Sequence, residues 1–313
     1  MWIIAGTVAT VVAAGLGLRL AIARNGPAVV DRIDRLVGGG ADVSLIERVK
    51  LGDAPGQTVA IYAPKQSGRG PLPVIIFVHG GGWHGGSPDD YGWAARGLAS
   101  AGFIVVLAGY RLYPQARYPA MLEDTARAIG WTHAHVGQYG GDPGHIVLVG
   151  HSAGAYNVVQ TVLDPQWLGG EGLASSAISR IIGMAGPYDF FPFDIEASRN
   201  SFGLAAEPEL TQPVNHARPA APPMLLMSGE ADTVVRPRNT KALAKALERA
   251  GASVSTLYLP DMGHTDIVLA LANPWRRRNP AVVEAITRFA RDGSTQSPPK
   301  SALPSLPVQP NMR

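Results

Sequence analysis

Short apolar runs alternate with longer amphipathic stretches along the chain, and this alternation predicts a regular succession of strands and helices. Residues 74–78 and 103–107 are each five consecutive apolar residues, which is typical of strands buried on both faces. The predicted strands are residues 43–51, 58–62, 74–78, 103–107, 145–149, 178–184, 224–227 and 253–259.

Helical stretches separate most of these strands, and Pro and Gly mark several of their ends. The predicted helices are residues 91–100, 119–136, 153–162, 239–250 and 280–291. Because strands alternate with helices, we expect an α/β fold with a mostly parallel central sheet and helices on both faces. Residues 188–213 have no clean period and many aromatic side chains, so we expect a short irregular lid over the strand ends.

The chain begins with an apolar segment. Residues 1–18 carry no charge, and residues 20–23 continue the run after Arg19. At about 1.5 Å per residue this length approaches the hydrocarbon core of a bilayer, about 30 Å thick. We therefore expect residues 1–24 to be a single-pass membrane anchor, and the basic residues that follow it favour a cytoplasmic body. The alternative is a signal segment that is cleaved after Ala23, with export of the protein.

The remaining chain divides into three parts. Residues 25–42 are predicted to be a linker with a short amphipathic piece, and residues 43–292 to be one globular domain. Residues 293–313 are rich in Ser and Pro, which predicts a disordered tail.

Composition narrows the functional classes. The 313 residues are 46% hydrophobic and 16% charged, as expected of a globular body, and the net charge is only +3. The basic residues form no stripe with interleaved aromatics, so nucleic-acid binding is not expected. The chain has no Cys, which excludes disulfides and a cysteine nucleophile. No metal-ligand spacing and no dinucleotide-binding glycine motif occurs, so we expect neither a metal nor a cofactor.

The predicted strand 145–149 runs directly into Gly150-His151-Ser152-Ala153-Gly154, and a predicted helix follows at once. A strand, a sharp turn and a helix are the context of a nucleophile elbow, in which a serine hydroxyl stands clear of the sheet. Side chains two residues before and after the serine would collide in such a turn, which explains Gly150 and Gly154. Ser152 is therefore the candidate nucleophile. We expect the turn to point His151 away from the site.

A second glycine-rich turn, His79-Gly80-Gly81-Gly82-Trp83, follows the predicted strand 74–78. Consecutive glycines let backbone N–H groups point together into a cavity, where they can stabilise an oxyanion together with the N–H of Ala153. A phosphate-binding loop is the alternative, but it would need Lys and Ser or Thr after the glycines.

Two further candidates follow later strands. Asp232 comes after the strand that ends at residue 227, and His264 comes after the strand that ends at residue 259. Asp232 is the candidate that orients His264, with Glu230 and Asp189 as alternative acids, and His264 is the candidate base. The order Ser, Asp, His is the one that the α/β-hydrolase fold uses.

Aromatic residues after the strand 178–184 suggest a substrate pocket. Four of them lie within six residues, which exceeds what a solvent-exposed loop needs. The alternative is that they only pin the lid to the body. The predicted pocket residues are Trp83, Tyr188, Phe190, Phe191 and Phe193.

In these motifs the chain resembles the α/β-hydrolase carboxylesterases of the hormone-sensitive-lipase-like group. The segment Gly140-Gly141-Asp142-Pro143 is similar to a branch with feruloyl-esterase-like enzymes, kynurenine formamidases and isoprenylcysteine methylesterases. The resemblance implies an esterase that forms an acyl-enzyme within a catalytic domain of residues 43–292. It assigns the nucleophile, base and orienting acid to Ser152, His264 and Asp232, and the oxyanion hole to Gly81, Gly82 and Ala153.

The resemblance has one gap, and it leaves other functions open. Residues 25–42 are too short for the helical cap that lipase-like members often carry, which puts the acyl-chain preference in doubt. An arylformamidase would use the same residues on an amide substrate. A binding protein without catalysis on this fold is the alternative outside the enzymes.

Overall fold

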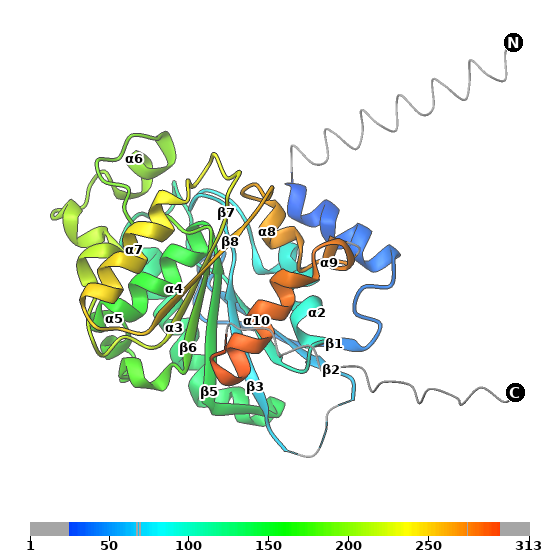
Figure 1. Cartoon of the computed structure of the whole chain (residues 1–313). Helices are drawn as coiled ribbons and strands as arrows, with labels where there is room; N and C mark the ends of the chain where they lie inside the picture. Colours follow the sequence, from blue (N-terminus) through cyan, green and yellow to red (C-terminus); the bar gives the residue numbers. More distant parts are fainter. Residues whose placement is uncertain (1–24, 67, 69, 274, 295–313) are drawn as a thin grey trace, which may run out of the picture.

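The computed structural model describes residues 25–66, 68, 70–273 and 275–294. Its centre is an eight-stranded sheet in the order β1-β2-β4-β3-β5-β6-β7-β8 (Figure 1). The strands are β1 (Val43–Lys50), β2 (Thr58–Pro64), β3 (Leu72–Val78), β4 (Ile104–Ala108), β5 (Gly141–His151), β6 (Arg180–Met184), β7 (Met224–Gly229) and β8 (Val254–Leu259).

Strand direction follows the predicted pattern. The first two strands pair antiparallel, and β2 also meets β4 antiparallel. From β4 to β8 all neighbours are parallel. The carboxyl ends of β3, β5, β7 and β8 therefore lie at one edge of the sheet, which is where a parallel sheet places its ligand site.

Helices cover both faces of the sheet, as predicted (Figure 1). The α-helices are α2 (Gly92–Ala99), α3 (Ala120–His135), α4 (Ala153–Leu163), α5 (Pro165–Gly170), α6 (Glu196–Phe202), α7 (Arg238–Arg249), α8 (Asp266–Leu269), α9 (Trp275–Arg278) and α10 (Pro280–Asp292). Short 3-10 turns are η1 (Pro88–Tyr91), η2 (Val136–Tyr139), η3 (Ser175–Ala177), η4 (Pro208–Thr211) and η5 (Pro213–His216). Because strands and helices alternate, the predicted α/β architecture is confirmed.

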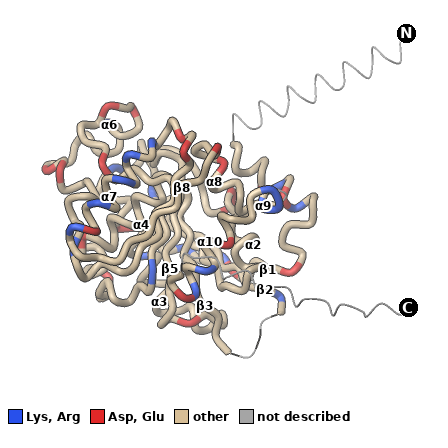
Figure 2. The backbone as a smooth tube through the Cα atoms, viewed as in Figure 1, with Lys and Arg blue, Asp and Glu red and all other residues tan. Residues whose placement is uncertain are grey.

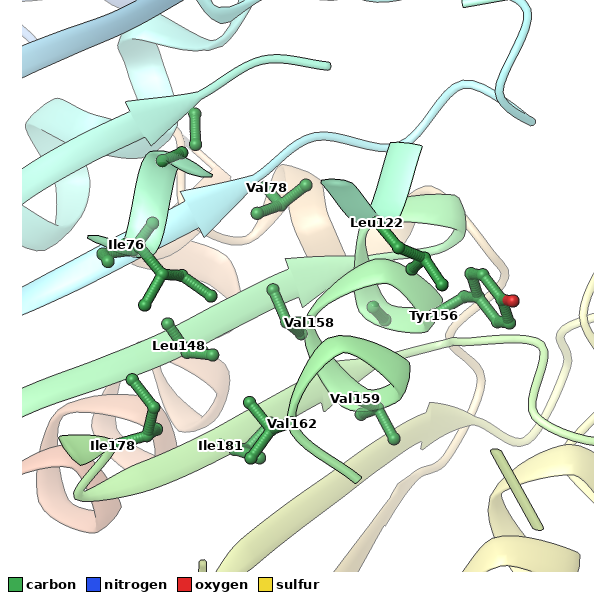
Figure 3. Packing of buried hydrophobic residues seen from close by; sticks show 14 of the residues in the cluster. Ile76, Val78, Leu122, Leu148, Tyr156, Val158, Val159, Val162, Ile178 and Ile181 are labelled. Atoms are coloured by element: carbon green, nitrogen blue, oxygen red, sulfur yellow. The ribbon is translucent and has the colours of Figure 1, made fainter. Parts of the chain in front are cut away.

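Two apolar cores separate the helices from the sheet. Figure 3 shows Val158 and Val162 of α4 packed with Leu148 of β5 and Ile181 of β6, and all four side chains are buried. The second core, on the other face, holds α2 and α10 against the central strands. The sheet is thus buried on both faces, which explains the unbroken apolar runs in its inner strands.

The segment that the sequence predicts as a linker is helical over residues 25–36 and packs on the body near α2. Asp34, only 2% exposed, accepts hydrogen bonds from Nε and Nη2 of Arg96 in α2 at 2.8 and 2.6 Å. It also accepts from the backbone N–H of Asn273 at 2.8 Å. A buried ion pair fixes this helix, and hydrophobic periodicity alone does not reveal such a pair.

The predicted lid, residues 188–213, is more ordered than expected, because it contains α6 and η4. The predicted membrane anchor at residues 1–24 lies outside the described residues, as does nearly all of the predicted tail. Across residues 25–294, apart from the three undescribed positions, no helix is long and apolar enough to cross a membrane.

Candidate active site

Ser152 occupies the turn between β5 and α4, where the sequence predicts a nucleophile elbow. Its backbone has φ 55° and ψ −122°, a strained conformation for a residue with a side chain. A Cβ atom at Gly150 would collide with the carbonyl oxygen of Gly154, and one at Gly154 would collide with that of Val78. The two glycines therefore let the chain turn tightly enough to present the Ser152 hydroxyl.

His264 lies between Ser152 and Asp232 in a chain of hydrogen bonds. Its Nε2 is 2.9 Å from Ser152 Oγ, and its Nδ1 is 2.8 Å from Asp232 Oδ2. Because an ionised carboxylate can only accept, Nδ1 carries the proton and Nε2 is left to accept from the serine hydroxyl. The three residues follow the ends of β5, β7 and β8. Ser152 and His264 are 112 positions apart in the sequence.

Asp232 is held as an anion by its surroundings. It is only 3% exposed, and burial is the largest influence on its pKa, acting upward. Hydrogen bonds from His264 and from the backbone N–H groups of Val234 and Val235, at 2.8 and 2.9 Å, outweigh burial and lower the pKa. Of the alternative acids, Glu230 is exposed, and among the described residues the carboxylate that hydrogen-bonds to His264 is that of Asp232, not that of Glu230 or Asp189.

His151 differs from the prediction, because the turn does not point it away from the site. It lines the cavity, and its Nε2 lies 3.0 Å from the carbonyl oxygen of His264, to which it donates. Burial lowers its pKa to about 3, so the imidazole is neutral. The sequence motif does not determine where this side chain points. Its orientation depends on the path of the loop after β8, which carries His264.

The glycine loop after β3 borders the same cavity. Gly81 and Gly82 have φ of 122° and 60°, in the region that favours glycine, and both line the cavity together with Ala153. The His79 imidazole stacks on Tyr110 with ring centroids 4.6 Å apart, and its Nδ1 donates to the carbonyl oxygen of Gly80 at 2.7 Å. Burial lowers its pKa to about 4, so it is a neutral support for the loop.

The cavity has a volume of about 630 Å³ and contains Ser152 and His264 in its lining. Of the predicted pocket aromatics, Trp83 and Phe190 line it. Their rings stack with centroids 5.9 Å apart, and the Trp83 indole donates to Asn157 Oδ1 at 3.1 Å. These two residues form an aromatic wall beside the serine.

Tyr188, Phe191 and Phe193 do not line the cavity, and for them the pocket prediction is wrong. Tyr188 is fully buried in the core, whereas Phe191 is 40% exposed. Phe193 packs on Phe191 and on Phe202 of α6. Successive residues of an irregular segment point in different directions, so their clustering in sequence did not place them on one wall.

Sequence reasoning missed part of the cavity lining. The segment after Asp232 contributes several lining residues, and the lid contributes several more. A signal was available, since both segments follow carboxyl ends of parallel strands. The missed lining residues are Tyr91, Pro187, Asp194, Ile195, Ala197, Ser198, Thr233, Val234, Val235, Arg236, Arg238, Asn239 and Thr265.

The chemistry available at this site is that of an activated serine. A hydroxyl next to an imidazole acceptor, with backbone N–H groups nearby, is suited to attack on a carbonyl carbon. Within the part of the chain that the structure describes, no three His, Asp or Glu side chains come together as metal ligands would.

Comparisons with known proteins show which family and which fold this chain shares. The model of the BD-FAE family matches residues 59–247. Esterase LipC of Mycobacterium tuberculosis is 30% identical over 237 residues, which is 69% of this chain and 59% of the relative. A probable isoprenylcysteine alpha-carbonyl methylesterase, ICMEL1 of Arabidopsis thaliana, is 29% identical over 243 residues, 71% of this chain and 51% of the relative.

This chain thus spans between about half and 60% of the length of these two relatives. Among solved structures, esterase B from Lactobacillus rhamnosis superposes with a TM-score of 0.72 at 19% identity, and the match covers 91% of this chain and 96% of that one. At 19% identity this similarity shows the fold alone.

Proposed function

Since this chain belongs to the BD-FAE family and has the α/β-hydrolase fold, we propose that it is a serine hydrolase that cleaves carboxylic esters. One observation carries the proposal above all: His264 lies within hydrogen-bond distance of both Ser152 and Asp232, at 2.9 and 2.8 Å. Ser152 and His264 line a cavity large enough for a small ester.

The first half of the reaction follows from the hydrogen-bond directions. As Ser152 Oγ attacks the ester carbonyl carbon, its proton passes to Nε2 of His264. Ionised Asp232 stabilises the imidazolium and keeps the ring in the productive orientation. The carbonyl oxygen becomes an oxyanion, and the N–H groups of Gly81, Gly82 and Ala153 are the donors proposed to stabilise it.

The second half returns the proton. His264 donates it to the leaving alcohol, so the carbon–oxygen bond breaks and an acyl group remains on Ser152. Water then takes the place of the alcohol, gives its proton to His264 and attacks the acyl carbon. The acid is released and Ser152 regains its hydrogen.

Hydrolysis of an amide such as an arylformamide is the second candidate, because the same residues would perform it. The specific observation in its favour is the Gly140-Gly141-Asp142-Pro143 segment, which is similar to that of kynurenine formamidases. The names of the relatives favour the ester, since LipC is an esterase and ICMEL1 a probable methylesterase.

Steady-state hydrolysis of 4-nitrophenyl butyrate and of N-formylkynurenine by the full chain tests the proposal. Ser152→Ala and His264→Ala should each lower kcat/KM for the ester by about 10³-fold or more while circular dichroism stays unchanged. His133→Ala, which removes an imidazole from α3, is the matched control and should keep the wild-type rate. Wild-type turnover of the formamide in preference to the ester would instead favour the second candidate.

For the location of the protein, we propose from the sequence alone that residues 1–24 hold the chain at a membrane. Export after cleavage is the alternative. Fractionation of cells that express the full chain, with determination of the N-terminal residue, separates the two. A membrane-bound chain that retains Trp2 agrees with the anchor, whereas a soluble chain that begins at Arg24 contradicts it.

A further inference from the structure

Two arginines of the cavity take no part in the proposed chemistry. Arg236 and Arg238 follow Asp232 by four and six positions, and both line the cavity that contains Ser152. Both side chains are exposed at its opening. Figure 2 shows the basic positions at the start of α7. A neutral ester needs no cation at this place, so the pair requires an explanation of its own.

Neither guanidinium has a partner within the described residues. No hydrogen bond, ion pair or ring contact joins Arg236 or Arg238 to another described side chain. Arg96 and Arg111, by contrast, are paired: Arg96 with Asp34 at 2.6 Å, and Arg111 with Asp124 at 2.7 Å. The two cations at the cavity thus keep their hydrogen-bonding capacity for a ligand.

The start of α7 adds to this positive potential. The helix has 12 residues, its N-cap is Pro237 with no side-chain capping bond, and its first turn contains no acid. Arg238 is its first residue, where a cation opposes the helix dipole. An anion bound between the guanidinium groups and the helix end would turn that unfavourable arrangement into a favourable one.

We propose that Arg236 and Arg238 form a subsite for a carboxylate, and that the preferred substrate is an ester carrying a second, ionised acid group. This inference rests on the proposed esterase function and names its substrate class. A guanidinium can bind a carboxylate through two parallel N–H donors, which fixes orientation as well as charge. Trp83 and Phe190 supply an apolar wall for the carbon chain between the two acid groups.

Among the described residues that line the cavity, Asp194 is the one carboxylate, and it lies on the lid. It has no hydrogen-bond or ion-pair partner for its side chain within the described residues, and it opposes an anionic ligand. Among the Asp, Glu, Lys and Arg side chains of the lining, two cations, Arg236 and Arg238, meet one anion, Asp194, which leaves one excess positive charge. Removing Asp194 should therefore strengthen the binding of an acidic ester.

Matched pairs of esters test the subsite with the full chain. Monoethyl adipate and ethyl hexanoate differ in a carboxylate on the acyl side, and 6-acetoxyhexanoate and hexyl acetate differ on the alcohol side. We expect one acidic ester to have a KM at least about tenfold below that of its neutral counterpart at low salt, a gap that narrows as salt rises. The pair that shows the gap tells which side of the ester meets the arginines.

Variants assign the effect to the residues. The double variant Arg236→Gln/Arg238→Gln should raise KM for the preferred acidic ester about tenfold, and it should change KM for the neutral counterpart far less. Asp194→Asn should lower that KM. Arg249→Gln, at the other end of α7, removes the same charge far from the cavity and should change nothing.

Equal KM values within both pairs, or a double variant that behaves like Arg249→Gln, would overturn the subsite while leaving the esterase standing. If no ester is turned over, calorimetry still tests the carboxylate subsite separately from the esterase function, because binding requires no catalysis. Adipate that binds the full chain more tightly than hexanoate, with the difference lost in the double variant, then supports the subsite although the proposed function fails. Equal binding of adipate and hexanoate overturns the subsite as well.

Discussion

At the scale of single residues, His151 is a buried neutral imidazole that joins two parts of the site. It follows Gly150 on the elbow, and its Nε2 donates to the backbone carbonyl of His264. Its Nδ1 lies next to Gly80 of the glycine loop, where an added Cβ would come 3.0 Å from that nitrogen. One side chain therefore contacts the loop that carries the candidate base and packs against the loop that carries the candidate oxyanion donors.

His151→Ala should lower kcat on the order of 10²-fold with little change in KM, because the His264 loop loses its hydrogen-bond donor and the imidazole shifts. His151→Gln keeps an N–H donor of similar reach and should recover most of the rate. Thermal unfolding of both variants provides the control for stability. Equal kcat in the Ala and Gln variants would contradict this positioning role.

The two aromatic residues Phe190 and Phe191 offer a matched pair on the lid. Phe190 lines the cavity, whereas Phe191 is 40% exposed outside it. Phe190→Ala should shift the preference for acyl-chain length, measured as the ratio of kcat/KM for 4-nitrophenyl butyrate and octanoate. Phe191→Ala should leave that ratio unchanged, and an equal shift in both variants would contradict the assignment of the wall.

The key site positions follow directly from sequence, whereas directions of side chains do not. Ser152, with Gly150 and Gly154, belongs to a motif whose spacing follows from steric limits in a tight turn. Asp232 and His264 follow strands whose carboxyl ends meet at one edge. The places of Tyr188, Phe193 and His151 depend on packing between distant segments, and no local pattern in the chain contains that information.

At the scale of elements, the helix over residues 25–36 is bound to the body through charge. Arg96 lies between Asp31 and Asp34, with Nη2 2.8 and 2.6 Å from their carboxylate oxygens, and its side chain is 7% exposed. A buried cation with two carboxylate partners is stable only while its partners remain. The strands and long helices were predictable because their apolar periods are strong, but this helix needed a tertiary partner to be recognised as part of the body.

Asp34→Asn should lower the free energy of unfolding by about 3 kcal/mol, because it leaves the Arg96 charge partly uncompensated in a buried place. Chemical denaturation of the full chain measures this. Asp89→Asn breaks the exposed pair with Arg48, whose side chains are 63% and 52% exposed, and serves as the control. That change should cost less than about 1 kcal/mol. Equal losses in the two variants would argue against a buried role for Asp34.

At the scale of the whole molecule, the fold holds two neutral histidines in its interior. Burial lowers the pKa of His79 to about 4 and that of His151 to about 3, both below the ordinary value of about 6.5. Below pH 6.5 the unfolded chain takes up protons that the folded chain does not bind. The contribution of these two groups to the free energy of unfolding is therefore fully present above about pH 6.5. It is lost as the pH falls towards 4 and below.

Denaturation midpoints measured between pH 7 and pH 4 should accordingly fall, and the slope should be smaller in His151→Gln, which removes one of the two buried groups. His133→Gln, on α3, is the control. A stability that does not change over this range would contradict the neutral burial of the two imidazoles.

The overall architecture was predictable because strand and helix alternate, but the cavity was not. Its lining comes from the glycine loop, the elbow, the lid and the segments after Asp232 and His264. The sequence predicts that each segment lies at the edge of the sheet. The shape of the cavity between the segments depends on how they pack in the assembled fold.

The central claim is that Ser152 is the nucleophile of a serine hydrolase, and covalent labelling measures it most directly. The full chain is treated with a fluorophosphonate, digested, and analysed by mass spectrometry to locate the modified residue. We predict one adduct, on Ser152, that is absent in Ser152→Ala and strongly slowed in His264→Ala, because the imidazole activates the hydroxyl. An adduct on another serine, or undiminished labelling of Ser152→Ala, would contradict the account.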